Sequence, residues 1–243
     1  MKYPPGYYQT NYRALRLREL RRAHGLLRLP LFYLISRFKR PIPGTWMPQM
    51  WADLECSKND LSDRFFMATE ARRLEMAELG FKEIGFRKLD RVLNPNRRDD
   101  GGIIYLDANR SVMAVLIYIR MHVGPPVNVD RDNFTIAFTA VFSNGTLSCT
   151  NTKFSFDNLP ENEVLRFPGS SAKAIYQHFT KRLGTYNEQP RSFPDLASLR
   201  SWSDLNTAKL FETRVERGLF LPMTDDEVKA AQLRIPPPLP RSS

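Results

Sequence analysis

Cys149 is a candidate nucleophile, because it lies in a polar stretch rich in serine and threonine, TAVFSNGTLSCTNTKFSF, at residues 139–156. A cysteine becomes nucleophilic when a neighbouring base, often a histidine, takes its proton. His122 or His178 could serve as that base if the fold brought either one to the thiol. Whether Cys149 points toward solvent or into the core therefore decides between a catalytic and a structural role.

The dipeptide Asn144–Gly145 favours the structural role. Asn-Gly is the preferred centre of a two-residue type I′ hairpin turn. A turn at these residues would pair Phe142 with Leu147, and Cys149 would share their apolar face. A thiol on such a face behaves as a small hydrophobic group with a raised pKa. We therefore predict that Cys149 is structural, and we identify no catalytic residue in the chain.

The same hairpin carries a ladder of hydroxyl side chains on its opposite face: Thr139, Ser148, Thr150 and Thr152. Cross-strand threonine and serine pairs stabilise sheets modestly and are typical of a solvent-facing surface. The alternative interpretation is the wall of a binding cleft, which requires a helix or loop to arch over the ladder.

A second candidate site lies on the predicted strand 111–123. One face of this strand is apolar throughout, from Met113 to Val123, and we expect it to be buried. The opposite face becomes polar at its end, at Tyr118, Arg120 and His122. Arginine can bind an anion and histidine can transfer a proton, so these three residues could line a cleft for a small ligand or substrate. The alternative is a strand end that is merely half solvated.

Metal and cofactor motifs are missing from the sequence. Its three histidines and two cysteines are scattered and form no zinc-binding spacing. Asp99–Asp100, predicted to lie in a turn, and Asp130 and Asp132 at a strand entry could hold a cation through oxygen, but turn chemistry explains them as well. The sequence also contains no phosphate-binding loop, dinucleotide fingerprint or nucleophile elbow. We expect no metal and no cofactor.

The positive charge of the chain is concentrated at its N-terminus. Residues 1–40 contain ten Lys and Arg residues and one acid, Glu19, so they carry +9 of the formal net charge of +10. Charge asymmetry of this kind indicates a polyanionic partner. The predicted contact residues are Arg13, Arg16, Arg18, Arg21, Arg22, Arg28, Arg37, Lys39 and Arg40.

Tyrosine, phenylalanine and leucine residues are interleaved with these cations, most densely in LPLFYLISRF at residues 29–38. Cations beside apolar residues suit the interface of an anionic membrane. Arginine and tyrosine also suit RNA, which remains a less favoured alternative. A third alternative is a helix that simply packs on its own domain. The aliphatic run favours a membrane or a protein partner; the oligomeric state is left open.

Length and composition place the chain among globular proteins. With 243 residues and 42% hydrophobic residues it can bury a substantial core without disulfides. Two cysteines suggest a reducing compartment. We recognise no secretory leader and no run of about 18 consecutive apolar residues. We expect a cytoplasmic protein that associates peripherally with a membrane.

The order of predicted elements is a helix over 11–29, a helix over 62–79, a strand near 81–93, hairpins over 103–123 and 134–154, a helix over 171–183 and two C-terminal helical segments. The first of these segments runs over about 194–217, and the second starts at Thr224 with a capping-box spacing to Glu227. Residues 1–10 are predicted to be irregular, and DNLPENEVLRFPGSS, at 157–171, is predicted to be a loop. Short connections between consecutive strands imply an antiparallel meander. The predicted fold class is therefore α+β, with a five-strand, mostly antiparallel sheet that helices cover on one face.

The sequence divides into a basic N-terminal arm at 1–43, an α+β body at 44–190, a helical C-terminal extension at 191–235 and a Pro-rich tail at 236–243. The favoured function is non-enzymatic, as a peripheral membrane or scaffold protein that uses its arm. The alternatives are a ligand-binding protein or enzyme that uses the cleft at Tyr118, Arg120 and His122, and an RNA-binding protein.

Overall fold

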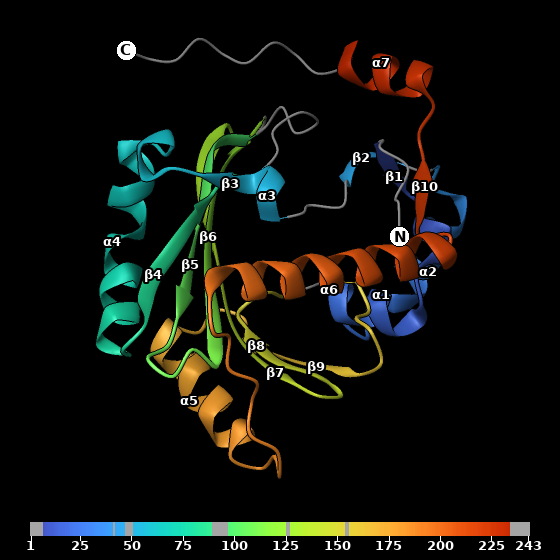
Figure 1. Cartoon of the computed structure of the whole chain (residues 1–243). Coiled ribbons are helices and arrows are strands. Elements are labelled where there is room, and N and C mark those ends of the chain that lie inside the picture. Colours follow the sequence, from blue (N-terminus) through green and yellow to red (C-terminus); the bar gives the residue numbers. More distant parts are fainter. Residues whose placement is uncertain are drawn as a thin grey trace.

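A computed structural model describes residues 7–40, 42–46, 51–88, 97–124, 127–153 and 156–233 of the chain, so the Pro-rich tail lies outside the described residues. A seven-stranded sheet forms the centre (Figure 1). Its strands, in spatial as well as sequence order, are β3 (Glu55–Cys56), β4 (Lys82–Arg87), β5 (Arg97–Leu106), β6 (Val112–Val123), β7 (Val129–Phe142), β8 (Gly145–Thr150) and β9 (Asn162–Arg166).

This sheet confirms the mixed α/β class with a mostly antiparallel sheet, but it has seven strands where five were predicted. Every neighbouring pair is antiparallel except β8 and β9, which run parallel. The segment of β9 was predicted to be a loop, because its pairing is long-range and has no local turn signal. A further correction concerns Asp99 and Asp100, which lie within β5 and are buried.

The hairpin of β7 and β8 forms as predicted, but its register differs. The turn residues are Ser143 and Asn144, so Phe142 pairs with Gly145 instead of Leu147. Moving the turn by one residue moves each partner by two, and side chains therefore keep their predicted faces. Gly145 has φ +145°, and a Cβ there would collide with the backbone carbonyl oxygen of Glu161. Glycine is thus required at position 145, where the Glu161 backbone lies against the turn of the hairpin.

The two faces of β6 are the reverse of the prediction. Ala114, Leu116 and Tyr118 are fully buried in the main core, whereas the Met113 face is only half-buried. The small side chain of Ala114 leaves room for the helices, and the Tyr118 ring packs edge-on against Phe65 at 6.0 Å. Shape complementarity with the covering helices therefore outweighs the uniform hydrophobicity of the opposite face.

Two helices cover one face of the sheet, at the positions predicted for them. α4 (Asp63–Glu78) begins at Ser62, whose hydroxyl accepts the Phe65 N–H, and α5 (Ala172–Leu183) begins at Ser171. Their apolar residues and the inner face of β5 to β8 make up the main core. Side-chain capping of the first helical turn explains why these starts could be predicted.

The second face is also covered in part, which corrects the prediction of a single covered face. α6 (Leu196–Glu216), a long helix predicted at 194–217, crosses it, and the short helix α3 (Trp51–Leu54) packs nearby (Figure 1). Trp51, Val141, Phe193 and Leu199 form a second buried cluster there.

A smaller sheet unites distant parts of the chain in the order β10–β1–β2. Its strands are β1 (Tyr8–Thr10), β2 (Ile42–Trp46) and β10 (Phe220–Pro222), all antiparallel. Residues 8–10 are therefore a strand, although the first ten residues were predicted to be irregular. Tyr8 and Phe220 join Phe211 of α6 in a third buried cluster. α7 (Asp225–Leu233) follows, with the predicted Thr224–Glu227 capping box.

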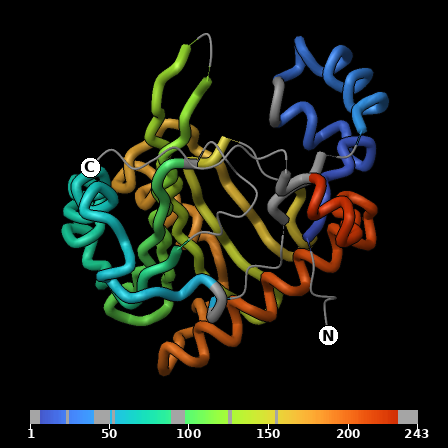
Figure 2. The backbone as a smooth tube through the Cα atoms, turned by 90° about the horizontal axis from the view of Figure 1, so that it is seen from above, coloured from blue at the N-terminus to red at the C-terminus, as the bar shows by residue number. Residues whose placement is uncertain are grey.

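The helix predicted over 11–29 is broken. A short 3-10 turn, η1 (Tyr12–Ala14), is followed by α1 (Leu17–His24), and α2 (Leu29–Phe38) begins after a bend. Gly25 ends α1 with φ +76°, a conformation that glycine adopts at little cost. Figure 2 shows both helices, in blue, at the rim of the molecule.

Candidate functional site

The helix α1 docks on the rest of the protein through the one acid of the arm. Glu19 is completely buried, and its carboxylate accepts a hydrogen bond from the guanidinium of Arg217 at 2.8 Å. It also accepts the backbone N–H groups of Arg16 and Asp157, at 2.8 and 2.6 Å. Charged and backbone donors together satisfy the carboxylate, as a buried charge requires.

A second carboxylate, that of Asp157 in the body, binds arginines of the arm. Its buried oxygens accept hydrogen bonds from Arg16 at 3.3 Å, from Arg18 at 2.6 Å and from Arg22 at 2.6 Å. Three of the nine predicted contact cations thus converge on one acid of the body. We call Glu19, Asp157, Arg217 and these three arginines the docking network.

The docking network lowers the pKa of both acids. Burial alone would raise the pKa of Glu19, but the hydrogen bond from Arg217 and those from the backbone lower it below the ordinary value. The pKa of Asp157 is lowered in the same way, because the hydrogen bonds from Arg18 and Arg22 outweigh the effect of burial. Both groups are therefore anionic at neutral pH and hold the arginines in place.

Beside the docking network lies a cavity of about 570 Å³, which we call the basic pocket. Its charged lining comprises Arg18 and Arg22 from α1, Lys153 and Asp157 from the segment before β9, and Arg166 from β9 itself. Leu159, Val164, Leu165 and two prolines add apolar surface, and Asn158 and Asn162 add amide groups. The described lining therefore combines four cations and one carboxylate with amide and apolar groups.

The basic pocket continues the hydroxyl ladder of the hairpin. β9 pairs with β8 so that Val164 lies opposite Ser148 and Arg166 lies opposite Thr150. The ladder was predicted to face solvent, yet Thr150 is buried, and the Thr139 and Ser148 hydroxyls lie 2.9 Å apart. The parallel strand β9 thus extends the polar face toward the arm.

The charges around Arg166 and its burial change the pKa of its guanidinium group. Burial lowers the pKa of its guanidinium, the nearby Arg22 lowers it further, and Asp157 acts in the opposite direction. Cations that lie this close in a concave, partly desolvated site repel one another more strongly than in water. An added anion would relieve this repulsion.

The predicted cleft residues on β6 are held by carboxylates of β7. Arg120 donates to Asp130 from Nε at 3.0 Å and from Nη2 at 2.6 Å, and His122 Nδ1 lies 2.9 Å from the same acid. Tyr118 donates to Asp132 at 2.9 Å, and burial followed by this hydrogen bond raises its pKa to about 12. These partners occupy the groups that were expected to meet a ligand.

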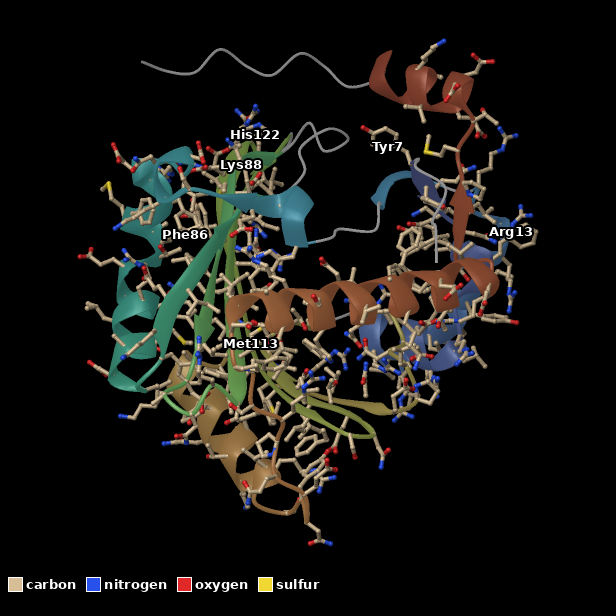
Figure 3. The ribbon with its side chains drawn as sticks, viewed as in Figure 1. Tyr7, Arg13, Phe86, Lys88, Met113 and His122 are labelled. Carbon is tan, nitrogen blue, oxygen red and sulfur yellow. The ribbon has the colours of Figure 1, made fainter. Side chains whose placement is uncertain are left out.

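The two predicted sites are separate. Figure 3 shows His122 at the upper end of the central sheet and Arg13 beside the N-terminal helices. Neither the basic pocket nor a neighbouring cavity of about 460 Å³ near the β7–β8 turn is lined by the β6 residues. A ligand cleft at Tyr118, Arg120 and His122 stays a prediction.

The remaining cations of the arm lie on η1 and α1 and on or next to α2. Within the described part of the chain they form no ion pair, and all are exposed: Arg13, Arg21, Arg28, Arg37, Lys39 and Arg40. Arg37 donates to the backbone carbonyl of Arg13 at 2.9 Å and stacks over Tyr33, and Lys39 lies over the Tyr12 ring. Their charges remain available at the surface.

The helix α2 exposes its apolar side chains. Leu27, just before the helix, is 98% exposed, Leu34 is 57% exposed and Phe38 is 76% exposed. Four exposed residues of the helix recur at helical spacing, and Leu27 precedes them in the adjoining turn. We call these five the α2 stripe: Leu27, Leu31, Leu34, Ile35 and Phe38. The buried residue of the helix is Ser36, a polar one. A stripe of this kind is normally covered by another surface.

Cys149 is fully buried among the apolar residues of the main core, as predicted. Burial, with a smaller contribution from Glu163, raises the pKa of its thiol to about 11. The thiolate that a nucleophile needs is therefore scarce at neutral pH.

Two kinds of feature are absent from the described residues. No group of three or more His, Cys, Asp or Glu side chains in these ranges is placed to hold a metal ion. None of the described helices combines the length and the apolar character that crossing a bilayer requires.

Comparison of the chain with protein-family models, with curated proteins and with solved structures finds no significant match in any of the three. Function must therefore be inferred from the geometry of this chain.

Three residues that shape the basic pocket were not identified from the sequence: Asp157, Lys153 and Arg166. Asp157 and Arg166 lie in a segment predicted to be a loop, and each is an ordinary charged residue in its local context. The signal that could have found them is indirect: a chain segment rich in arginine needs a carboxylate somewhere in the body if it is to dock.

Proposed function

We propose that this protein associates peripherally with an anionic membrane surface through α2. The observation that carries the proposal is the exposure of the α2 stripe, from Leu27 to Phe38, on a helix whose buried residue is a serine. Apolar side chains at helical spacing gain free energy when they leave water, by about 1.5–3 kcal/mol for each large side chain that is fully buried.

The charges around the stripe favour a membrane over a neutral partner. Exposed cations lie at both ends of α2, with Arg28 before it and Arg37, Lys39 and Arg40 at and beyond its end. Cations beside a shallow apolar stripe match the boundary between headgroups and acyl chains. Each cation near an anionic leaflet contributes about 1 kcal/mol.

A sedimentation experiment tests the proposal. The full chain is mixed with vesicles of phosphatidylcholine, with and without phosphatidylserine, and the bound fraction is measured. We expect binding that requires phosphatidylserine and falls at least about tenfold in the double variant Leu31→Ser/Leu34→Ser, because two apolar contacts are lost. The full chain is needed, since β1 and the docking network connect the arm to the body.

Leu205→Ser supplies the matched control. Leu205 is 72% exposed, but it lies on α6 outside the stripe. Its replacement should leave vesicle binding unchanged. Failure of the wild type to bind either vesicle, or equal losses in both variants, would reject the membrane proposal and leave the stripe to a protein partner, as in a scaffold role.

RNA binding by the arm remains the alternative. It would appear as a gel shift whose affinity falls steeply with salt, since phosphate contacts release counterions. The α2 stripe argues against it, because RNA offers little apolar surface for exposed leucines. The Leu31→Ser/Leu34→Ser variant should leave any such shift intact.

A further inference from the structure

The basic pocket has a charge pattern that the docking of α1 does not require. Both oxygens of Asp157 already accept hydrogen bonds from Arg16, Arg18 and Arg22. Lys153 adds a further cation to the same lining, at an exposed position, and Arg166 adds one from the end of β9. Arg18, Arg22 and Lys153 already outnumber the one carboxylate among the described lining residues, so the cavity carries a positive potential that concave walls concentrate.

The dimensions of the cavity suit a small ligand. Its volume of about 570 Å³ falls in the range of pockets for metabolites and cofactors, and it exceeds what a bare phosphate ion fills. Leu159, Val164 and Leu165 add apolar surface to the same lining. A ligand with an anionic end and a less polar body would match both kinds of surface.

We propose that the basic pocket binds a small ligand that carries a phosphate monoester, with the phosphate among Arg18, Arg22, Lys153 and Arg166. Guanidinium groups pair with phosphate oxygens through two parallel hydrogen bonds, and the lysine adds a mobile positive charge. A phosphate monoester carries close to two negative charges at neutral pH. It would therefore balance most of the positive charge that the lining holds in excess.

Such a phosphate could belong to a soluble metabolite or to a lipid headgroup. Glycerol 3-phosphate is the soluble probe, and vesicles that contain phosphatidic acid present the same group on a lipid. Calorimetric titration with the first, and sedimentation with the second, distinguish the two sources. Saturable binding in either experiment, lost with pocket variants, supports the site and identifies its source.

Lys153→Gln is the decisive variant, because Lys153 is exposed and stands outside the docking network. Loss of one charged hydrogen bond should weaken binding of glycerol 3-phosphate, or of phosphatidic acid vesicles, by about tenfold. Lys173→Gln is the matched control: Lys173 is exposed on α5 and does not line the cavity, so its replacement should change nothing. Lys153→Glu should weaken binding further than Lys153→Gln.

The inference is overturned if the wild type binds neither probe saturably, or if Lys153→Gln and Lys173→Gln bind as the wild type does. It does not depend on membrane association through α2. The titration in solution contains no membrane, and the Leu31→Ser/Leu34→Ser variant should bind glycerol 3-phosphate normally. A failure of one proposal can therefore be recognised without affecting the other.

Discussion

The two helices of the N-terminal arm meet the rest of the protein in opposite ways. α1 is the more charged helix, yet it docks: Glu19 is buried against Arg217, and Leu20 is 2% exposed in the third buried cluster. α2 is the more apolar helix, yet Leu31, Leu34 and Phe38 face outward. From charge alone, one would expect α2 to dock on the body and α1 to stay at the surface.

The difference shows that complementarity decides whether a helix docks. Asp157 of the body pairs with the arginines at and within α1, and Arg217 pairs with Glu19. Leu15, just before α1, and Leu20, within it, are buried in the third cluster beside Phe211 and Phe220. α2 touches that cluster through Leu29 and packs against α1 and η1. Its stripe is left for another surface.

The largest effect should come from removing the buried acid of α1. Glu19→Ala leaves Arg217 without its carboxylate, and breaking a buried ion pair from one side typically costs about 3–5 kcal/mol. Urea denaturation followed by tryptophan fluorescence measures the loss. Glu70→Ala, an exposed acid on α4, is the control and should cost little. Equal losses in the two variants would mean that α1 is not held by this pair.

A pair of leucine substitutions compares the helices directly. Leu20→Ala on α1 should destabilise the protein by about 2–5 kcal/mol, because it leaves a cavity in the third cluster. Leu34→Ala on α2 should change stability by less than about 0.5 kcal/mol, since the side chain is 57% exposed. Thermal and urea denaturation of both variants provide the measurement. A large loss for Leu34→Ala would show that α2 packs on the body in solution.

A smaller loss is expected at the second carboxylate. Asp157→Asn keeps the shape of the side chain but removes the charge that Arg16, Arg18 and Arg22 share. These arginines remain partly exposed, so solvent compensates them, and we expect a loss of about 1–2 kcal/mol. The same denaturation assay applies. A cost equal to that of Glu19→Ala would contradict the view that Glu19 is the main anchor.

The smallest effect is a pH dependence. Both Glu19 and Asp157 have pKa values lower in the folded protein than in the unfolded chain, where they are about 4. Their contribution is complete above that value and is lost as the pH falls through the folded pKa values. We expect the wild type to lose more stability than Glu19→Gln between about pH 5 and pH 3. Parallel curves would show that Glu19 keeps an ordinary pKa.

Local signals predicted much of the fold. Ser62, Ser171 and Thr224 begin α4, α5 and α7, because a side-chain oxygen next to a helix start satisfies a free N–H wherever it occurs. The turn at 143–144 was found to within one residue, and Cys149 was correctly placed in the core because residues on one strand keep their faces. Such signals act over a few residues and survive in any tertiary context.

The candidate site was predicted only in part. The arm was identified by its arginines, but Asp157, which receives three of them, lies far along the chain in a segment with no local signal. The reversed faces of β6 have a similar cause: Ala114 and Tyr118 are buried because α4 and α5 leave space of their shape, which no pattern within the strand records.

By itself, then, the sequence determined the α/β class, the hairpins, the helix starts and the concentration of cations before residue 41, because each depends on neighbouring residues. Only the tertiary structure decided which arginines face an acid, which leucines stay in water, and that β9 pairs in parallel with β8 beside the basic pocket. These outcomes depend on contacts between residues far apart in the chain, and their energies depend on burial, which exists only once the chain has folded.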